Sequence, residues 1–76
     1  MNRGIDMKIF EIILKQYVKA LESCENANVL SEIDYCKMRA YHDAISYLST
    51  NYEYILFASK YMKREIVIIK KMFHDK

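Results

Sequence analysis

The near absence of helix-breaking residues constrains this chain more than any other feature of its sequence. Among 76 residues there is no proline and one glycine, Gly4. These two residue types supply most sharp turns, and tight hairpin loops favour an Asn-Gly or Asp-Gly pair, which does not occur here. The sequence therefore argues against an all-β fold and predicts an all-α fold with few, long helices.

Three segments show the helical spacing of apolar residues, and each begins with a helix-start signal. Asp6 is the expected cap of the first helix, and Ser31 that of the second. Thr50 and Glu53 have the spacing of a capping box for the third. The second break is so short that the last two helices could be nearly continuous. The predicted helices cover about residues 6–24, 32–49 and 51–73.

The apolar faces of these helices are unusually wide. The first and third carry apolar side chains over roughly 180° of their circumference, whereas a surface helix needs a stripe somewhat over 100° wide. The second has a stripe of small residues and a separate patch of larger ones. We expect the small stripe to pack closely against the first helix, so that added bulk at Ala40 destabilises the bundle. The stripe is Cys36, Ala40 and Ala44, and the patch is Met38, Tyr41 and Ile45.

The surplus of apolar surface predicts a partner chain. A single domain of this length rarely gains more than ~3–5 kcal/mol from its core, and large exposed apolar patches usually mark interfaces. We expect a homodimer of three-helix bundles, with a more tightly wrapped monomer as the alternative. Glu65 falls within the same arc, so it must reach water or meet a cation such as Lys15 or Lys19. The edge that the chain itself would least easily cover is expected to form the interface with the partner or second copy, and it consists of Tyr54, Phe57, Tyr61, Ile68 and Met72.

Charge is segregated along the chain although the formal net charge is only +2. Residues 20–53 carry net −4, and residues 54–76 carry net +4. Such a basic face could contact phosphates or an acidic protein, or could simply be solvated. A helix-turn-helix is not favoured, because the helices are long and the turn has no glycine. The basic residues concerned are Lys60, Lys63, Arg64, Lys70 and Lys71.

No group of residues has the pattern of a catalytic or metal site. Asp43 cannot orient His42 as a catalytic partner, because adjacent residues of a helix point about 100° apart. We expect the His42 side chain to be exposed. Cys24 and Cys36 are too few for a structural zinc site and are expected to be buried, free thiols. One glycine cannot form a glycine-rich phosphate loop. We therefore expect no enzyme activity, no metal and no cofactor.

The remaining expectations concern location and function. No secretory signal is recognisable, and the longest uncharged run, nine residues from Ala44 to Tyr52, is too short for a membrane span, so the protein is expected to be cytoplasmic. The function that fits is a non-catalytic regulator, inhibitor or adaptor that binds another protein through its helical surface. Such small chains suit accessory proteins of phages and other mobile elements. The alternative is a small nucleic-acid-binding protein that uses the basic third helix.

Overall fold

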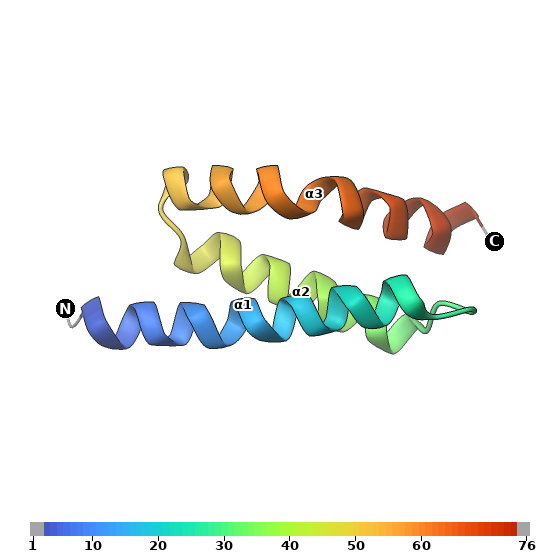
Figure 1. Ribbon diagram of the computed structural model, residues 1–76, viewed down its shortest axis with the longest axis horizontal. Coiled ribbons are helices and arrows are strands. Elements are labelled where there is room, and N and C mark those ends of the chain that lie inside the picture. The colour runs from blue at the N-terminus through green and yellow to red at the C-terminus, as the bar shows by residue number, and fades with distance from the viewer. Residues whose placement is uncertain (1–2, 75–76) are drawn as a thin grey trace.

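The chain folds into three long helices packed side by side. A computed structural model describes residues 3–74, and within these residues it contains no strand. The helices run up, down and up, so that the two ends of the chain lie at opposite ends of the bundle (Figure 1). This confirms the all-α prediction. The helices are α1 (Arg3–Asn26), α2 (Glu32–Leu48) and α3 (Asn51–His74).

Two of the three helix-start signals act as predicted. The Ser31 hydroxyl accepts hydrogen bonds from the amides of Ile33 (3.2 Å) and Asp34 (3.4 Å) and so caps α2. The Thr50 hydroxyl accepts from the Glu53 amide at 3.2 Å, and the Glu53 carboxylate accepts from the Thr50 amide at 2.8 Å. This reciprocal pair satisfies two of the amides that a helix start leaves without partners. Asp6 was the wrong cap, because α1 already begins at Arg3.

α2 and α3 are separate, antiparallel helices and not one continuous element (Figure 1). α2 ends at Leu48, and the backbone of the following cap residue, Ser49, is extended (φ −87°, ψ 149°). Its amide and hydroxyl both donate to the Ile45 carbonyl, at 3.0 and 2.5 Å. These bonds satisfy a carbonyl that the end of the helix would otherwise leave without a partner, and the chain then reverses before Asn51.

The core runs along the axis of a narrow bundle, 45 × 19 × 16 Å across its Cα atoms. The backbones of α1 and α2 approach each other along more of their length than either approaches α3. Small side chains allow such close approach, and α1 contributes the small Ala20 and Cys24 to the core, whereas α3 contributes only large side chains. The buried apolar core consists of Tyr17, Ala20, Leu21, Cys24, Met38, Ile45, Phe57, Tyr61 and Ile68.

The prediction that the small-residue stripe of α2 packs against α1 was wrong. Cys36 and Ala40 are exposed and Ala44 is only partly buried. The other patch faces inward instead, with Met38 and Ile45 fully buried. The physical reason is area, because burial stabilises by about 25 cal/mol per Å² of apolar surface. A Met and an Ile therefore gain more from the core than a Cys and an Ala.

Added bulk at position 40 is consequently expected to be tolerated. Ala40→Leu should change the free energy of unfolding by no more than about 0.5 kcal/mol, as for other surface substitutions. The matched control is Ala20→Leu, because Ala20 is 9% exposed in the core, where overpacking costs about 1–3 kcal/mol. Urea denaturation of both variants measures the difference. Equal destabilisation by the two substitutions would contradict the orientation of α2.

The helices are also too polar to cross a bilayer. Within residues 3–74, none combines the length with the hydrophobicity that a membrane span requires.

Candidate functional site

A cluster of polar side chains lies buried where the three helices meet. Its centre is the Glu65 carboxylate of α3, which is inaccessible to solvent. One carboxylate oxygen, Oε1, accepts a hydrogen bond from Arg39 Nη1 of α2 at 2.5 Å. The other, Oε2, accepts from the Tyr17 hydroxyl of α1 at 2.6 Å and pairs with His42 Nδ1 of α2 at 2.8 Å. One side chain of α3 is thereby bonded to both other helices.

The cluster continues through the imidazole of His42. Paired with the Arg39 guanidinium, the Glu65 carboxylate only accepts hydrogen bonds, so the tautomer of His42 that fits this geometry has its proton on Nδ1 and donates it to Glu65. The second ring nitrogen, Nε2, lies 2.8 Å from the Tyr54 hydroxyl oxygen of α3. When the imidazole is neutral, that hydroxyl donates to Nε2. No buried polar side-chain atom in the described part of the chain lacks a hydrogen-bond partner, so the cluster is fully satisfied.

Aromatic rings surround the cluster and keep it dry. The Tyr17 ring meets Phe57 edge-on with 4.9 Å between ring centres, and Tyr61 with 5.5 Å. Burial, followed by the hydrogen bond to Glu65 and the charge of that carboxylate, raises the pKa of the Tyr17 phenol well above its ordinary value. Tyr17 is therefore a protonated donor across the ordinary pH range, and its role is to hold the carboxylate in place.

Two expectations about this cluster were wrong. His42 is buried, at 6% exposure, and not exposed. The cation that Glu65 needs comes from Arg39 on α2, and not from Lys15 or Lys19 on α1. A signal for both was present in the sequence. A carboxylate in the middle of an apolar arc requires donors opposite it, and the inward-facing patch of α2 carries His42 and Arg39 among its apolar residues.

The aromatic edge expected to form a dimer interface lies mainly in the protein's own core. The expectation that this edge would be the hardest for the chain to cover was wrong, because α3 turns it toward α1 and α2 around Glu65. The 180° apolar arc of α3 has two edges, either of which could face the core. The edge beside Glu65 faces inward, because that carboxylate is bonded to α1 and α2. Tyr54 is partly buried, and the others are 3–9% exposed, namely Phe57, Tyr61, Ile68 and Met72.

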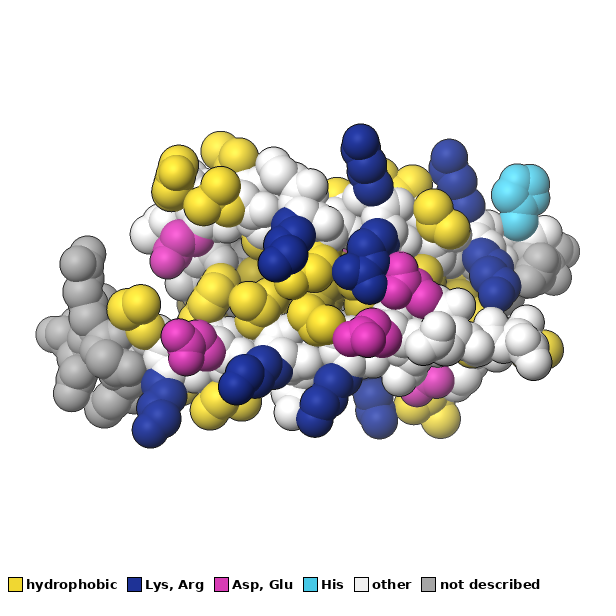
Figure 2. Space-filling view, viewed as in Figure 1, with side chains coloured by type: hydrophobic (Ala, Val, Ile, Leu, Met, Phe, Trp, Pro, Cys, Tyr) yellow, Lys and Arg dark blue, Asp and Glu magenta, His cyan; other side chains and the backbone are white. Residues whose placement is uncertain are grey.

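The opposite side of α3 leaves large apolar side chains in water, and we call it the outer apolar face. Exposure of its members ranges from 41% for Ile66 to 71% for Tyr52. At 100° per residue they fall within one side of the helix, interrupted by Lys63 and Lys70. Figure 2 shows apolar side chains gathered on this helix and in the valley between α1 and α3. The outer apolar face consists of Tyr52, Ile55, Leu56, Ile66, Val67 and Phe73.

The five basic residues singled out in the sequence do not form one continuous patch. Lys60 lies over the Tyr61 ring, 5.4 Å from its centre. Arg64 donates two hydrogen bonds to the Glu25 carboxylate of α1, at 2.9 and 2.6 Å. Lys71 donates to the Ala27 carbonyl at 3.1 Å. Of the five, Lys63 and Lys70 are exposed and make no such contact within the described residues.

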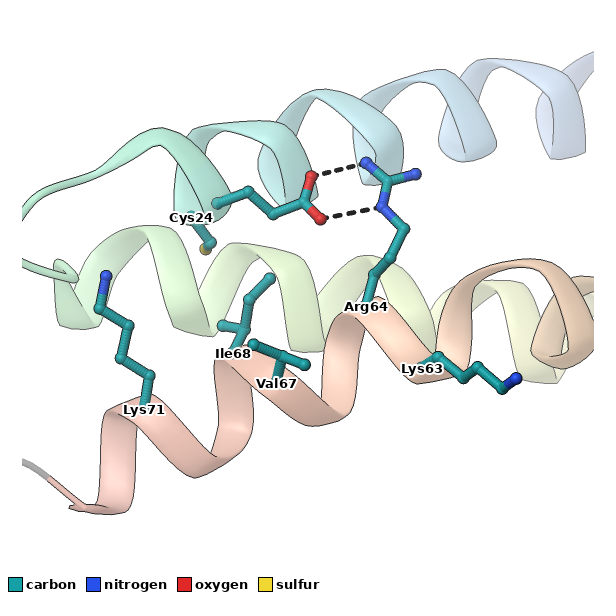
Figure 3. A pocket seen from close by; sticks show the side chains of 7 residues that line it. Cys24, Lys63, Arg64, Val67, Ile68 and Lys71 are labelled. Atoms are coloured by element: carbon teal, nitrogen blue, oxygen red, sulfur yellow. Dashed lines mark hydrogen bonds and ion pairs between the residues drawn. The ribbon is translucent and has the colours of Figure 1, made fainter.

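Three of these basic residues meet at a shallow pocket between α1 and α3 (Figure 3). Buried Cys24 and Ile68 form its floor, beside the more exposed Val67. Lys63 and Lys71 extend at opposite ends, and the Arg64–Glu25 pair lies between them (Figure 3). The pocket is therefore apolar at its floor and charged at its rim.

The Arg64–Glu25 pair contributes little to stability. The hydrogen bonds from Arg64 lower the pKa of the Glu25 carboxyl. A depressed carboxyl pKa stabilises the folded state above the ordinary pKa of glutamate, and this contribution is lost as the pH falls through the lowered value. The two side chains are 41% and 32% exposed, so solvent screens the pair and its contribution is about 0–1 kcal/mol.

The two cysteines are free thiols in different surroundings. Cys24 is buried as expected, and burial, with a smaller effect of Asp34 and Glu25, raises the pKa of its thiol. Cys36 was expected to be buried and is exposed, because it belongs to the outward-facing stripe of α2. Among the side chains that the structure describes, residues 7–74, no three of His, Cys, Asp or Glu are grouped so that they could hold a metal ion.

Comparison of the chain with protein families, with curated proteins and with solved structures finds no match. Its function must therefore be inferred from the surfaces described above.

Proposed function

We propose that this protein is a non-catalytic regulator, inhibitor or adaptor that binds another protein through the outer apolar face of α3. The observation that supports the proposal is the exposure of that face: Tyr52, Ile55, Val67 and Phe73 are each more than 60% exposed. Large apolar patches are uncommon on monomers and usually mark interaction sites. Accessory proteins of phages and other mobile elements are the class in which such a small binding chain fits.

The exposed side chains of this face could still gain free energy by burial against a partner. Full burial of one large apolar side chain stabilises by roughly 1.5–3 kcal/mol. Aromatic residues such as Tyr52 and Phe73 are enriched in interfaces, whereas lysine is depleted at their centres. Lys63 and Lys70 lie within this face, so a partner would cover the apolar side chains around them while the two long lysine side chains extend to water or to acidic groups of the partner. The buried cluster, sealed by aromatic rings, serves in this proposal to hold α3 in position.

The test is affinity capture with a matched pair of double variants of the full chain. Ile55→Gln with Ile66→Gln removes two isoleucines of the outer apolar face. Ile12→Gln with Ile33→Gln removes two exposed isoleucines of α1 and α2, which are 55% and 69% exposed against 61% and 41% for the first pair. Surface substitutions of this kind change stability by about 0.5 kcal/mol or less, so both variants fold. We expect wild type and the second variant to retain one stoichiometric protein after nuclease treatment, and the first to lose it.

Equal capture by both variants would contradict the proposal. Retention that nuclease abolishes would favour nucleic-acid binding, for which the exposed Lys63 and Lys70 are the supporting feature. That alternative has its own signature, because affinity for nucleic acid falls by about 0.9 log units per phosphate contact for each tenfold rise in salt.

A homodimer remains an expectation, and it would use the exposed faces because the Tyr54-to-Met72 edge is covered. Sedimentation equilibrium of the wild type decides it, since a mass that stays at 9.1 kDa over a wide concentration range would end the dimer proposal. The location we propose is the cytoplasm. Two free thiols, one of them exposed, suit a compartment that keeps cysteines reduced.

A further inference from the structure

The pocket between α1 and α3 combines an apolar floor with a basic rim, and this combination indicates what it binds. We infer that it accepts an acidic segment of the partner protein, with one aliphatic side chain on the floor and a carboxylate at each end. This inference rests on the proposed function and names the chemistry of the partner. The floor is formed by Cys24 and Ile68, with Val67 beside it. The ends are formed by Lys63 and Lys71.

Charge within the pocket selects an acidic segment. Arg64 is already paired with Glu25 through two hydrogen bonds, so these two charges cancel. The positive charges that remain at the rim are Lys63 and Lys71. Lys71 donates one hydrogen bond to the neutral Ala27 carbonyl, which leaves its charge and two of its three donors available. The Arg64–Glu25 pair also shows that a carboxylate fits against this stretch of α3 (Figure 3). Both lysines belong to the basic part of the chain, residues 54–76, whose net charge is +4.

The spacing of the two lysines gives the geometry of the segment. Lys63 and Lys71 are eight residues apart on α3, which corresponds to a separation of about 12 Å along the helix axis. A partner helix lying along α3 matches this distance when two glutamates flank an aliphatic residue four positions before and four positions after it. Residues at such spacing share one face of a helix.

A peptide segment explains the pocket better than nucleic acid or lipid does. A phosphate backbone would use Arg64 as a bidentate donor, but Arg64 is occupied by Glu25. A lipid surface would be contacted by a broad outer face and not by a pocket whose floor is buried between two helices. The aliphatic floor instead fits a single side chain, as in interfaces where a few anchors fill pockets.

The experiment is an NMR titration of the isotope-labelled full chain with synthetic helical peptides. The first peptide has a central leucine flanked by glutamates at the spacing given above. The second replaces both glutamates by lysine, and the third replaces the leucine by alanine. We expect the first peptide to shift the amide signals of Cys24, Lys63, Val67 and Lys71. The second and third should bind at least about tenfold more weakly, because charge complementarity and the buried anchor are lost.

Protein variants supply the matched control. Lys63→Glu should weaken binding of the first peptide about tenfold, because a charge at the rim of the pocket is reversed. Lys37→Glu reverses the charge of an exposed lysine of α2 that does not line this pocket, and should leave binding unchanged. Equal binding of the acidic and basic peptides, equal binding without the leucine, or no localised shift would each overturn the inference. Duplex oligonucleotide and anionic vesicles are titrated in the same way. If one of them causes these localised, Lys63-dependent shifts and the peptide causes none, the inference is overturned in favour of nucleic acid or lipid, respectively.

The inference and the proposed function fail separately. A chain that binds the acidic peptide in this pocket but captures no protein would contradict the proposed function and leave the specificity of the pocket standing. A chain that captures a protein through the outer apolar face but ignores the peptide would contradict the inference alone.

Discussion

Glu65→Ala is expected to leave the protein largely unfolded at 25 °C. The substitution removes the acceptor of the Tyr17 hydroxyl and of His42 Nδ1, both of which are buried, and breaks the ion pair with Arg39. Breaking a buried ion pair from one side costs about 3–5 kcal/mol. The core of a chain this small supplies only ~3–5 kcal/mol in total, so the loss is comparable to the whole stability. Far-UV circular dichroism and urea denaturation measure it.

Two further variants show whether an unfolded Glu65→Ala variant reflects loss of the polar cluster or a general sensitivity of this small domain to substitution. Glu65→Gln preserves shape and one acceptor oxygen but turns an amide toward the donors, so it should remain folded and lose about 1.5–3 kcal/mol. Glu11→Ala removes an exposed glutamate of α1 and should change stability by about 0.5 kcal/mol or less. Urea midpoints of Glu65→Ala and Glu65→Gln close to that of the wild type would show that the cluster does not hold α3 in place.

Replacing the cluster by apolar side chains is expected to have the opposite effect. In the triple variant Tyr17→Phe, His42→Leu and Glu65→Met, no buried charge remains and the volumes stay similar. Arg39, whose side chain is 38% exposed, can turn to water. Apolar replacement of buried ion clusters is often neutral or stabilising by about 1–4 kcal/mol. We expect the triple variant to be at least as stable as the wild type by urea denaturation.

The comparison between the triple variant and Glu65→Ala separates two roles of the cluster. A stable triple variant means that the polar groups contribute specificity, by permitting one register of α3, and not net stability. A triple variant less stable than the wild type by more than about 1 kcal/mol would contradict this. The polar cluster would then contribute more to the free energy of unfolding than a packed apolar core does. His42→Leu alone is the control, since it removes the bonds to Tyr54 and Glu65 but leaves Arg39 and Tyr17 on the carboxylate.

Helical periodicity predicted α2 but not which of its faces points into the core. Two apolar patches on that helix had similar helical spacing, and the sequence offered no way to weigh them without knowing what stood opposite. Burial of Met38 and Ile45 turned His42 and Arg39 toward α3. That orientation placed their donors beside Glu65. The polar cluster therefore follows from which face of α2 is buried. The prediction of an exposed His42 failed because His42 was judged only against its neighbour Asp43.

The sequence by itself determined the helices, because their causes are local. The absence of proline, the wide apolar arcs, the Ser31 cap and the Thr50–Glu53 capping box all act within a few residues of chain. Only the tertiary structure decided which edge of α3 is buried, that Arg39 and not a lysine of α1 pairs with Glu65, and that Lys63 and Lys71 flank an apolar pocket. Those features depend on side chains 23 to 48 residues apart in the chain. An apolar arc of 180° is wider than the stripe that one helix buries, so the buried part of the arc is determined only when the three helices pack together.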